Sequence, residues 1–159
     1  MNVDTFIETY PKSLIANPEV LDDAEFRQDI YTKLHPCPEP SLLALVRELF
    51  QREQANRFAH EPISNQFESL YWAAMFLYQI GDVSDVIPMW KAKNLDMDSG
   101  AGFDVQFLVG PGIERTLDYL DNQKPNDSRL AAAYIRKCDA AGDFDDMDEW
   151  LSAKISYYS

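Results

Sequence analysis

Carboxylates are the main side chains in this sequence that could do chemistry, since 27 of its 159 residues are Asp or Glu, two are His and two are Cys. The densest acidic run consists of Asp143, Asp145, Asp146, Asp148 and Glu149. A second acidic set, near two glycines, consists of Asp96, Asp98 and Asp104. Such groups can ligate a cation, transfer protons or bind a basic partner, and their spacing decides among these roles.

Neither acidic set has the spacing of a calcium loop. An EF-hand loop that began at Asp96 would have Ala101 where glycine is required and Phe107 where a bidentate glutamate is required. The later run places Met147 at its fifth position, which should be a ligand. The two histidines and two cysteines share no zinc-ligand spacing. We therefore expect no metal and no cofactor.

Two glycine pairs, Gly100 with Gly102 and Gly110 with Gly112, raise the question of a phosphate-binding loop. Such a loop usually follows a strand, opens a helix and often carries a lysine. No clear strand precedes these glycines, aspartates surround the first pair, and no lysine or arginine lies between the pairs. We therefore interpret the glycines as corners between helices, with Gly110 as a left-handed helix C-cap.

The sequence contains no recognisable catalytic set. With only two histidines, a serine or cysteine nucleophile has few bases, and no nucleophile-elbow motif is present. Pairs of carboxylates arise by chance in so acidic a chain and carry no information about hydrolytic chemistry. We expect a protein that is not an enzyme, in which the acidic runs are either solvated helix N-termini or a surface that binds a partner.

Helices are the elements that must position these residues. Apolar residues at helical spacing predict helices within residues 5–10, 22–34, 42–50, 67–80, 86–93, 113–120, 130–141 and 145–155. Residues 103–109 fit both a strand and a helix, and we expect a helix because a lone strand would have no partner. We expect Glu48 and Glu53 to pair with Arg52 and Arg57 on the solvent side of their helix.

The helices are expected to form one all-α domain over residues 1–159, because the length suits a single core. Gly81-Asp82 and Gly142-Asp143 each end an apolar helix and start another, which indicates irregular antiparallel helical hairpins. Stacked hairpins of this kind make an α-solenoid, here a degenerate tetratricopeptide-like one.

The aromatic residues divide into two groups. We expect Trp72, Tyr134 and Trp150 to lie in the core, because aromatic side chains at helical spacing usually pack there. Tyr157 and Tyr158 stand at the end of the sequence, where a role at an interface is favoured, since tyrosine suits half-wet contacts.

The formal charge of −13 bears on localisation and partners. Bare nucleic acid and anionic membrane surfaces would be repelled, whereas a basic protein would be attracted. The start of the sequence does not resemble a signal peptide, and the apolar run over residues 70–80 is too short to cross a bilayer. We expect a cytoplasmic protein that binds a basic partner through the acidic residues named above, together with Tyr157 and Tyr158.

Three segments carry a resemblance to a known class of proteins: WKAK at 90–93, GFDVQFLVGPG at 102–112 and TLDYL at 116–120. With their surroundings, residues 65–122, they resemble small bacterial helical proteins associated with the immunity proteins of polymorphic toxin systems. The resemblance implies a protein that binds and neutralises a cognate toxin domain, and it brings no catalytic residues. A nuclease-like toxin would be basic, because it must grip phosphates. The alternatives are a helical-repeat adaptor that binds a cellular peptide or protein and, least favoured, a small helical enzyme.

Overall fold

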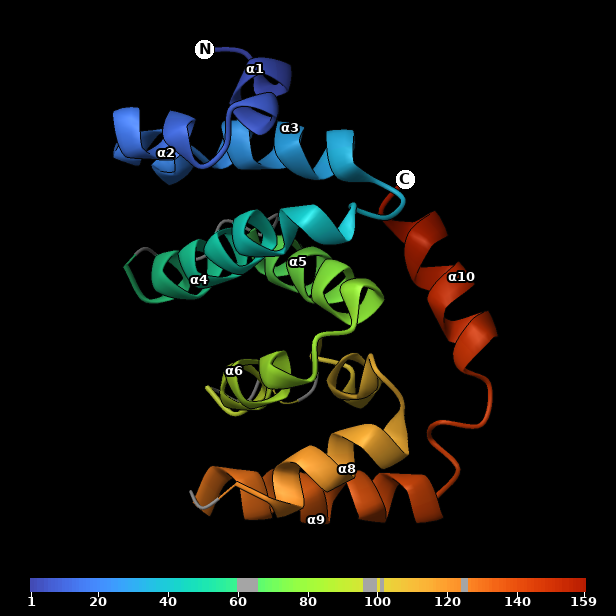
Figure 1. Ribbon diagram of the computed structural model, residues 1–159. Coiled ribbons are helices and arrows are strands. Elements are labelled where there is room, and N and C mark those ends of the chain that lie inside the picture. The colour runs from blue at the N-terminus through green and yellow to red at the C-terminus, as the bar shows by residue number, and fades with distance from the viewer. Residues whose placement is uncertain (60–65, 96–99, 101, 124–125) are drawn as a thin grey trace. The chain divides into compact units, whose positions relative to one another are not determined.

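The computed structural model describes residues 1–59, 66–95, 100, 102–123 and 126–159, and every regular element in these ranges is helical (Figure 1). The elements, with η for short 3-10 helices, are α1 (Val3–Glu8), α2 (Lys12–Ala16), η1 (Pro18–Asp22), α3 (Ala24–Leu34), η2 (Pro40–Leu42), α4 (Leu43–Ala59), α5 (Gln66–Ile80), η3 (Val83–Asp85), α6 (Val86–Lys93), η4 (Val105–Val109), α8 (Ile113–Asp121), α9 (Asn126–Ala140) and α10 (Met147–Tyr157). The all-α class expected from the sequence is confirmed.

The chain divides into two compact units, which are described separately below. Unit 1 consists of Met1–Phe76 together with Tyr157–Ser159, and unit 2 consists of Leu77–Ser156. The single domain over residues 1–159 and the solenoid-like stacking of hairpins stay predictions.

Local signals place several helix ends where the sequence predicts them. The side chain of Asp23 caps α3 by accepting hydrogen bonds from the main-chain N–H groups of Glu25 and Phe26. Helix α6 runs over Val86–Lys93, as expected. Its Pro88 falls in the first turn, where a missing N–H group leaves no acceptor unpaired.

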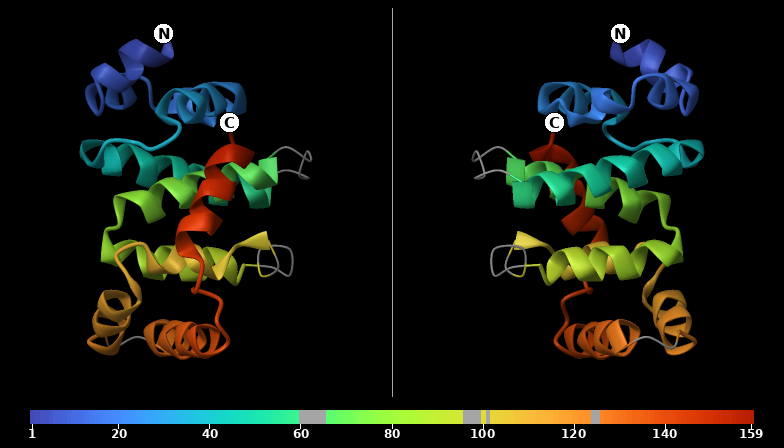
Figure 2. Two further views of the ribbon diagram at one scale, coloured as in Figure 1. Left: turned by 90° about the vertical axis from the view of Figure 1, so that its right-hand side faces the viewer. Right: turned by 90° about the vertical axis from the view of Figure 1, so that its left-hand side faces the viewer.

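Unit 1 is built around α3. Helix α1 packs against α3, and both α3 and α4 pack against η1 (Figures 1 and 2). Apolar side chains that are completely buried here are Phe6, Leu21, Ile30, Tyr31, Leu45 and Leu49. Burial of these side chains is the main source of stability for this unit.

A buried ion pair lies within unit 1. Arg27 on α3 donates from Nε to Glu53 Oε1 on α4 over 2.7 Å, and the two side chains are only 2% and 3% exposed. The expectation that Glu53 lies on the solvent side is therefore wrong, because the residue faces α3 and meets a cation there. The other predicted pair on this helix, Glu48 with Arg52, is confirmed at 2.9 Å on a partly exposed face.

Unit 2 is centred on α9, which packs against α6 and α8 (Figure 2). The short helix η4 packs against α6 and α8, and its Phe107 ring contacts the rings of Phe103 and Trp150. The helical expectation for residues 103–109 is thus confirmed, in the tighter 3-10 form over Val105–Val109. Trp72 is buried as expected, whereas Tyr134 and Trp150, also expected in the core, are only partly buried.

The glycine corners differ from the expectation in one respect. Gly110 has an ordinary right-handed conformation, with φ −49° and ψ −47°, so it is not a left-handed cap. Its role is close packing, because a Cβ atom at this position would lie 2.6 Å from the carbonyl oxygen of Tyr78. The left-handed positions in this part of the chain are Gly81, Gly112 and Gly142, with φ of 75°, 105° and 84°.

Candidate acidic binding surfaces

The predicted acidic run forms an exposed stretch of unit 2 between α9 and α10. We call its five residues the acidic segment: Asp143, Asp145, Asp146, Asp148 and Glu149. All five are exposed, whereas the intervening Phe144 is buried and anchors the turn. The turn starts at Gly142 with φ 84°, and the main-chain N–H of Asp143 donates to the carbonyl of Cys138 over 3.0 Å.

None of the carboxylates of the acidic segment forms an ion pair with any residue that the structure describes. The following basic residue, Lys154, pairs with Asp104 over 2.6 Å. Asp148 and Glu149 lie in the first turn of α10, where the helix dipole favours negative charge. The segment therefore displays a local excess of negative charge to solvent.

Of the second predicted acidic set, the structure describes Asp104. Asp96 and Asp98 lie outside the described residues. Asp104 is partly buried, and its carboxylate accepts from the indole N–H of Trp150 over 2.9 Å in addition to pairing with Lys154. Because its charge is compensated within unit 2, Asp104 serves mainly to hold α10 against the start of η4.

A cleft of about 810 Å³ lies in unit 1 and is lined by both tyrosines that the sequence singled out. We call it the acidic cleft. Its lining includes Glu25, His35, Glu68, Trp72, Tyr157 and Tyr158. No lysine or arginine is among the described residues that line it, and Glu25 and Glu68 form no ion pair with any described residue.

The aromatic residues of the acidic cleft have different roles. The indole of Trp72 is stacked with the rings of Tyr31 and Tyr158, at centroid distances of 5.4 and 5.2 Å. Tyr158 is buried in this stack, so the expectation of a half-wet position is wrong for this residue. Tyr157 is instead 61% exposed, and its hydroxyl donates a hydrogen bond to the Glu68 carboxylate. This hydrogen bond raises the pKa of Tyr157.

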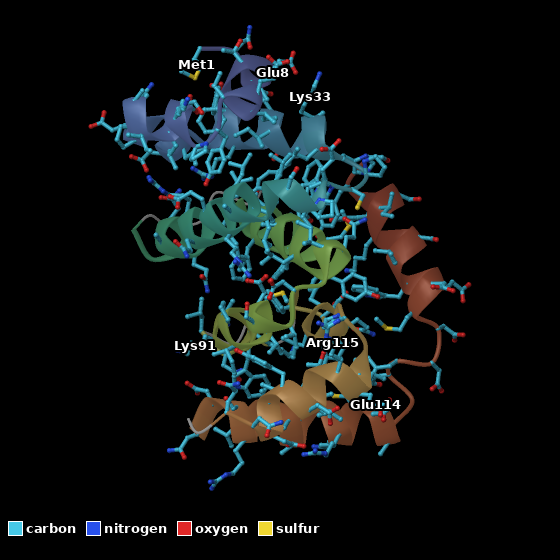
Figure 3. All side chains as sticks on the ribbon, in the orientation of Figure 1. Met1, Glu8, Lys33, Lys91, Glu114 and Arg115 are labelled. Carbon is cyan, nitrogen blue, oxygen red and sulfur yellow. The ribbon has the colours of Figure 1, made fainter. Side chains whose placement is uncertain are left out.

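The lysine nearest in sequence to the acidic cleft is occupied elsewhere. Lys33 on α3 pairs with Asp4 on α1 over 2.7 Å. Figure 3 shows Lys33 close to Glu8, which also belongs to α1. Lys33 therefore does not neutralise the carboxylates of the cleft. One further group lacks a partner, since the indole N–H of Trp72 is buried and has no acceptor among the described residues.

Burial shifts the pKa of two thiols and of one lysine in the described part of the chain. Burial raises the pKa of both thiols, Cys37 and Cys138, which disfavours the reactive thiolate. Burial lowers the pKa of Lys93, but its ammonium is committed to the carbonyls of Gly100 and Phe103. No group of three or more potential metal ligands occurs in the described part of the chain. Within those same ranges, no helix is both long enough and apolar enough to cross a bilayer.

The sequence analysis singled out the acidic segment and Tyr157 but not the acidic cleft. Glu25 and Glu68 belong to α3 and α5, and only the fold brings them together with Tyr157 at the end of α10. No spacing signal within one helix could have indicated this grouping. In comparisons with known proteins, no family model, curated protein or solved structure matches this chain.

Proposed function

We propose that this protein is a non-catalytic binding module for a basic protein, and that its partner is a cognate toxin domain that it neutralises. The observation that carries the proposal is the acidic segment, whose exposed carboxylates have no ion-pairing partner in the described residues. Displaying such charge without compensation works against compactness, so it is best explained by association or solubility.

Charge complementarity gives the interaction its speed and its selectivity. An acidic surface attracts a basic partner before contact and repels nucleic acid, which carries the same sign of charge. A toxin that cleaves nucleic acid needs a basic surface to hold phosphates. An acidic protein that covers this surface would block the substrate and the catalytic groups beneath it.

The test is to purify the product of the gene directly upstream, where the gene for a cognate toxin is expected, and to measure its affinity for this chain. The acidic segment is neutralised by changing its four aspartates to Asn and Glu149 to Gln. A matched control neutralises exposed carboxylates elsewhere, namely Glu19, Asp29, Glu39, Glu114 and Asp118. Both variants have the same net charge, so a difference in affinity reports the location of the charge.

We expect the segment variant to bind at least tenfold more weakly than the control, which corresponds to about 1.4 kcal/mol. Far-UV circular dichroism should show both variants folded, because exposed charges contribute little to stability. Equal affinities would contradict a role for the segment. If the upstream product does not bind at all, the toxin partner is ruled out and the adaptor alternative is favoured.

A further inference from the structure

We infer that the acidic cleft of unit 1 receives a cationic side chain, arginine in preference, from a protein segment bound by this chain. The inference rests on the proposed function, since it specifies how part of a basic partner is recognised. It concerns a surface formed by Glu25, Glu68 and Tyr157, none of which belongs to the acidic segment.

The first ground is charge. Glu25 and Glu68 both line the cleft, both are exposed, and neither is paired with a basic residue in the described part of the chain. Among the described residues, no lysine or arginine lines the cleft. A cation that enters this concave space would be attracted by two carboxylates.

The second ground is the aromatic wall. The Tyr157 ring is exposed, and its orientation is held by the hydrogen bond to Glu68 and by an edge contact with Tyr158 at 5.1 Å between ring centroids. A fixed aromatic face beside a carboxylate suits a planar guanidinium, which can stack on the ring and donate to the oxygen together. Lysine would form the charge contact without the planar stacking, and we therefore expect arginine to bind more tightly.

Trp72 provides a spectroscopic probe of the cleft. It lines the cleft and is 6% exposed, and its indole nitrogen is completely buried with no acceptor among the described residues. The indole N–H signal therefore reports a change in the cleft lining without being a contact of the ligand.

The test uses the full chain and three short probes: acetyl-Gly-Arg-Gly-amide, its lysine analogue, and its citrulline analogue, which keeps the shape of arginine without the charge. Binding is followed by NMR chemical shifts of the Trp72 indole N–H and by titration. We expect the arginine probe to bind about tenfold more tightly than the citrulline probe, with lysine between them. Equal binding of arginine and citrulline would overturn the inference.

Matched variants locate the site. Glu25→Gln with Glu68→Gln should weaken the arginine probe about tenfold, whereas Glu19→Gln with Glu114→Gln, which changes exposed carboxylates outside the cleft, should not. Glu114 is seen on α8 in Figure 3. Tyr157→Ala should weaken binding, and Tyr157→Phe should retain most of it because the ring remains. Unchanged binding in the Glu25 and Glu68 double variant would place the site elsewhere.

The same variants separate this inference from the proposed function. If the upstream gene product binds both double variants equally and the arginine probe does not bind, the cleft inference fails while the proposed function stands. If the upstream product does not bind but the arginine probe binds in a cleft-dependent way, the toxin partner fails and the arginine site remains.

Discussion

Glu53 is buried in an ion pair with Arg27. We therefore predict that Glu53→Gln lowers the stability of the protein far more than Glu48→Gln, the same change on the same helix. Glu53 Oε1 accepts from Arg27 Nε over 2.7 Å and from the Tyr31 hydroxyl over 2.9 Å. The Arg27 guanidinium also donates to the main-chain carbonyls of Leu21 and Asp22, over 2.7 and 3.1 Å. Of these acceptors, only Glu53 carries a charge.

Glu53→Gln keeps the shape and one acceptor oxygen but removes the compensating charge. Breaking a buried pair in this way typically costs about 3–5 kcal/mol, because the remaining charge stays buried. We expect a loss near the lower limit, about 3 kcal/mol, since two main-chain carbonyls still accept from Arg27. Replacing both partners, with Arg27→Met and Glu53→Leu, should be less harmful than Glu53→Gln alone, because no unpaired charge remains.

Glu48→Gln is the matched control, since it makes the same chemical change on the same helix. Glu48 and Arg52 are 27% and 26% exposed, and Arg52 keeps a second carboxylate partner in Asp22. We expect a loss below about 0.5 kcal/mol. Urea unfolding followed by far-UV circular dichroism measures both variants in the transition of unit 1. Equal losses for the two variants would refute the reasoning from burial.

Substitutions at three other residues test the packing, capping and titration described above. Gly110→Ala should cost about 1–3 kcal/mol, because its Cβ would lie 2.6 Å from the Tyr78 carbonyl oxygen, and an unchanged urea midpoint would contradict that close approach. Asp23→Ala should cost about 1 kcal/mol by removing the cap of α3, whereas Asp23→Ser should retain most of the stability. Burial holds the pKa of Tyr31 well above 10.0, so with rising pH the unfolded chain loses this proton first, and stability should fall above pH 10.0. Tyr31→Phe should make that fall shallower, and an identical pH profile would contradict the assignment.

Much of the fold could be predicted because its signals are local. Asp23 ahead of an apolar run indicates the start of α3, and Pro88, three residues after Asp85, is tolerated because it falls in the first turn of α6. The choice of helix for residues 103–109 rested on the lack of a pairing strand, and it is confirmed. The inferences at Asp23 and Pro88 need only neighbouring residues, which a sequence displays directly.

The remaining features depend on contacts between residues far apart in the chain. The sequence predicts that Glu53 faces solvent. Its burial follows from its pairing with Arg27, which lies 26 positions away in the chain. The sequence around Gly110 is typical of a corner between helices. Glycine is required at this position because the Tyr78 main chain lies too close for a Cβ atom. The acidic cleft likewise exists only after α3, α5 and the end of α10 have come together within unit 1.

The central claim is that this protein recognises a basic protein through its acidic surfaces, and the salt dependence of association tests it most directly. The measurement is the stopped-flow association rate with the upstream gene product between low salt and about 0.15 M, where charges more than about 8 Å apart are largely screened. We predict that the rate falls at least about tenfold, and that neutralising the acidic segment removes most of this dependence. A tight complex whose association rate is the same at all salt concentrations, with and without the segment's charges, would contradict the claim.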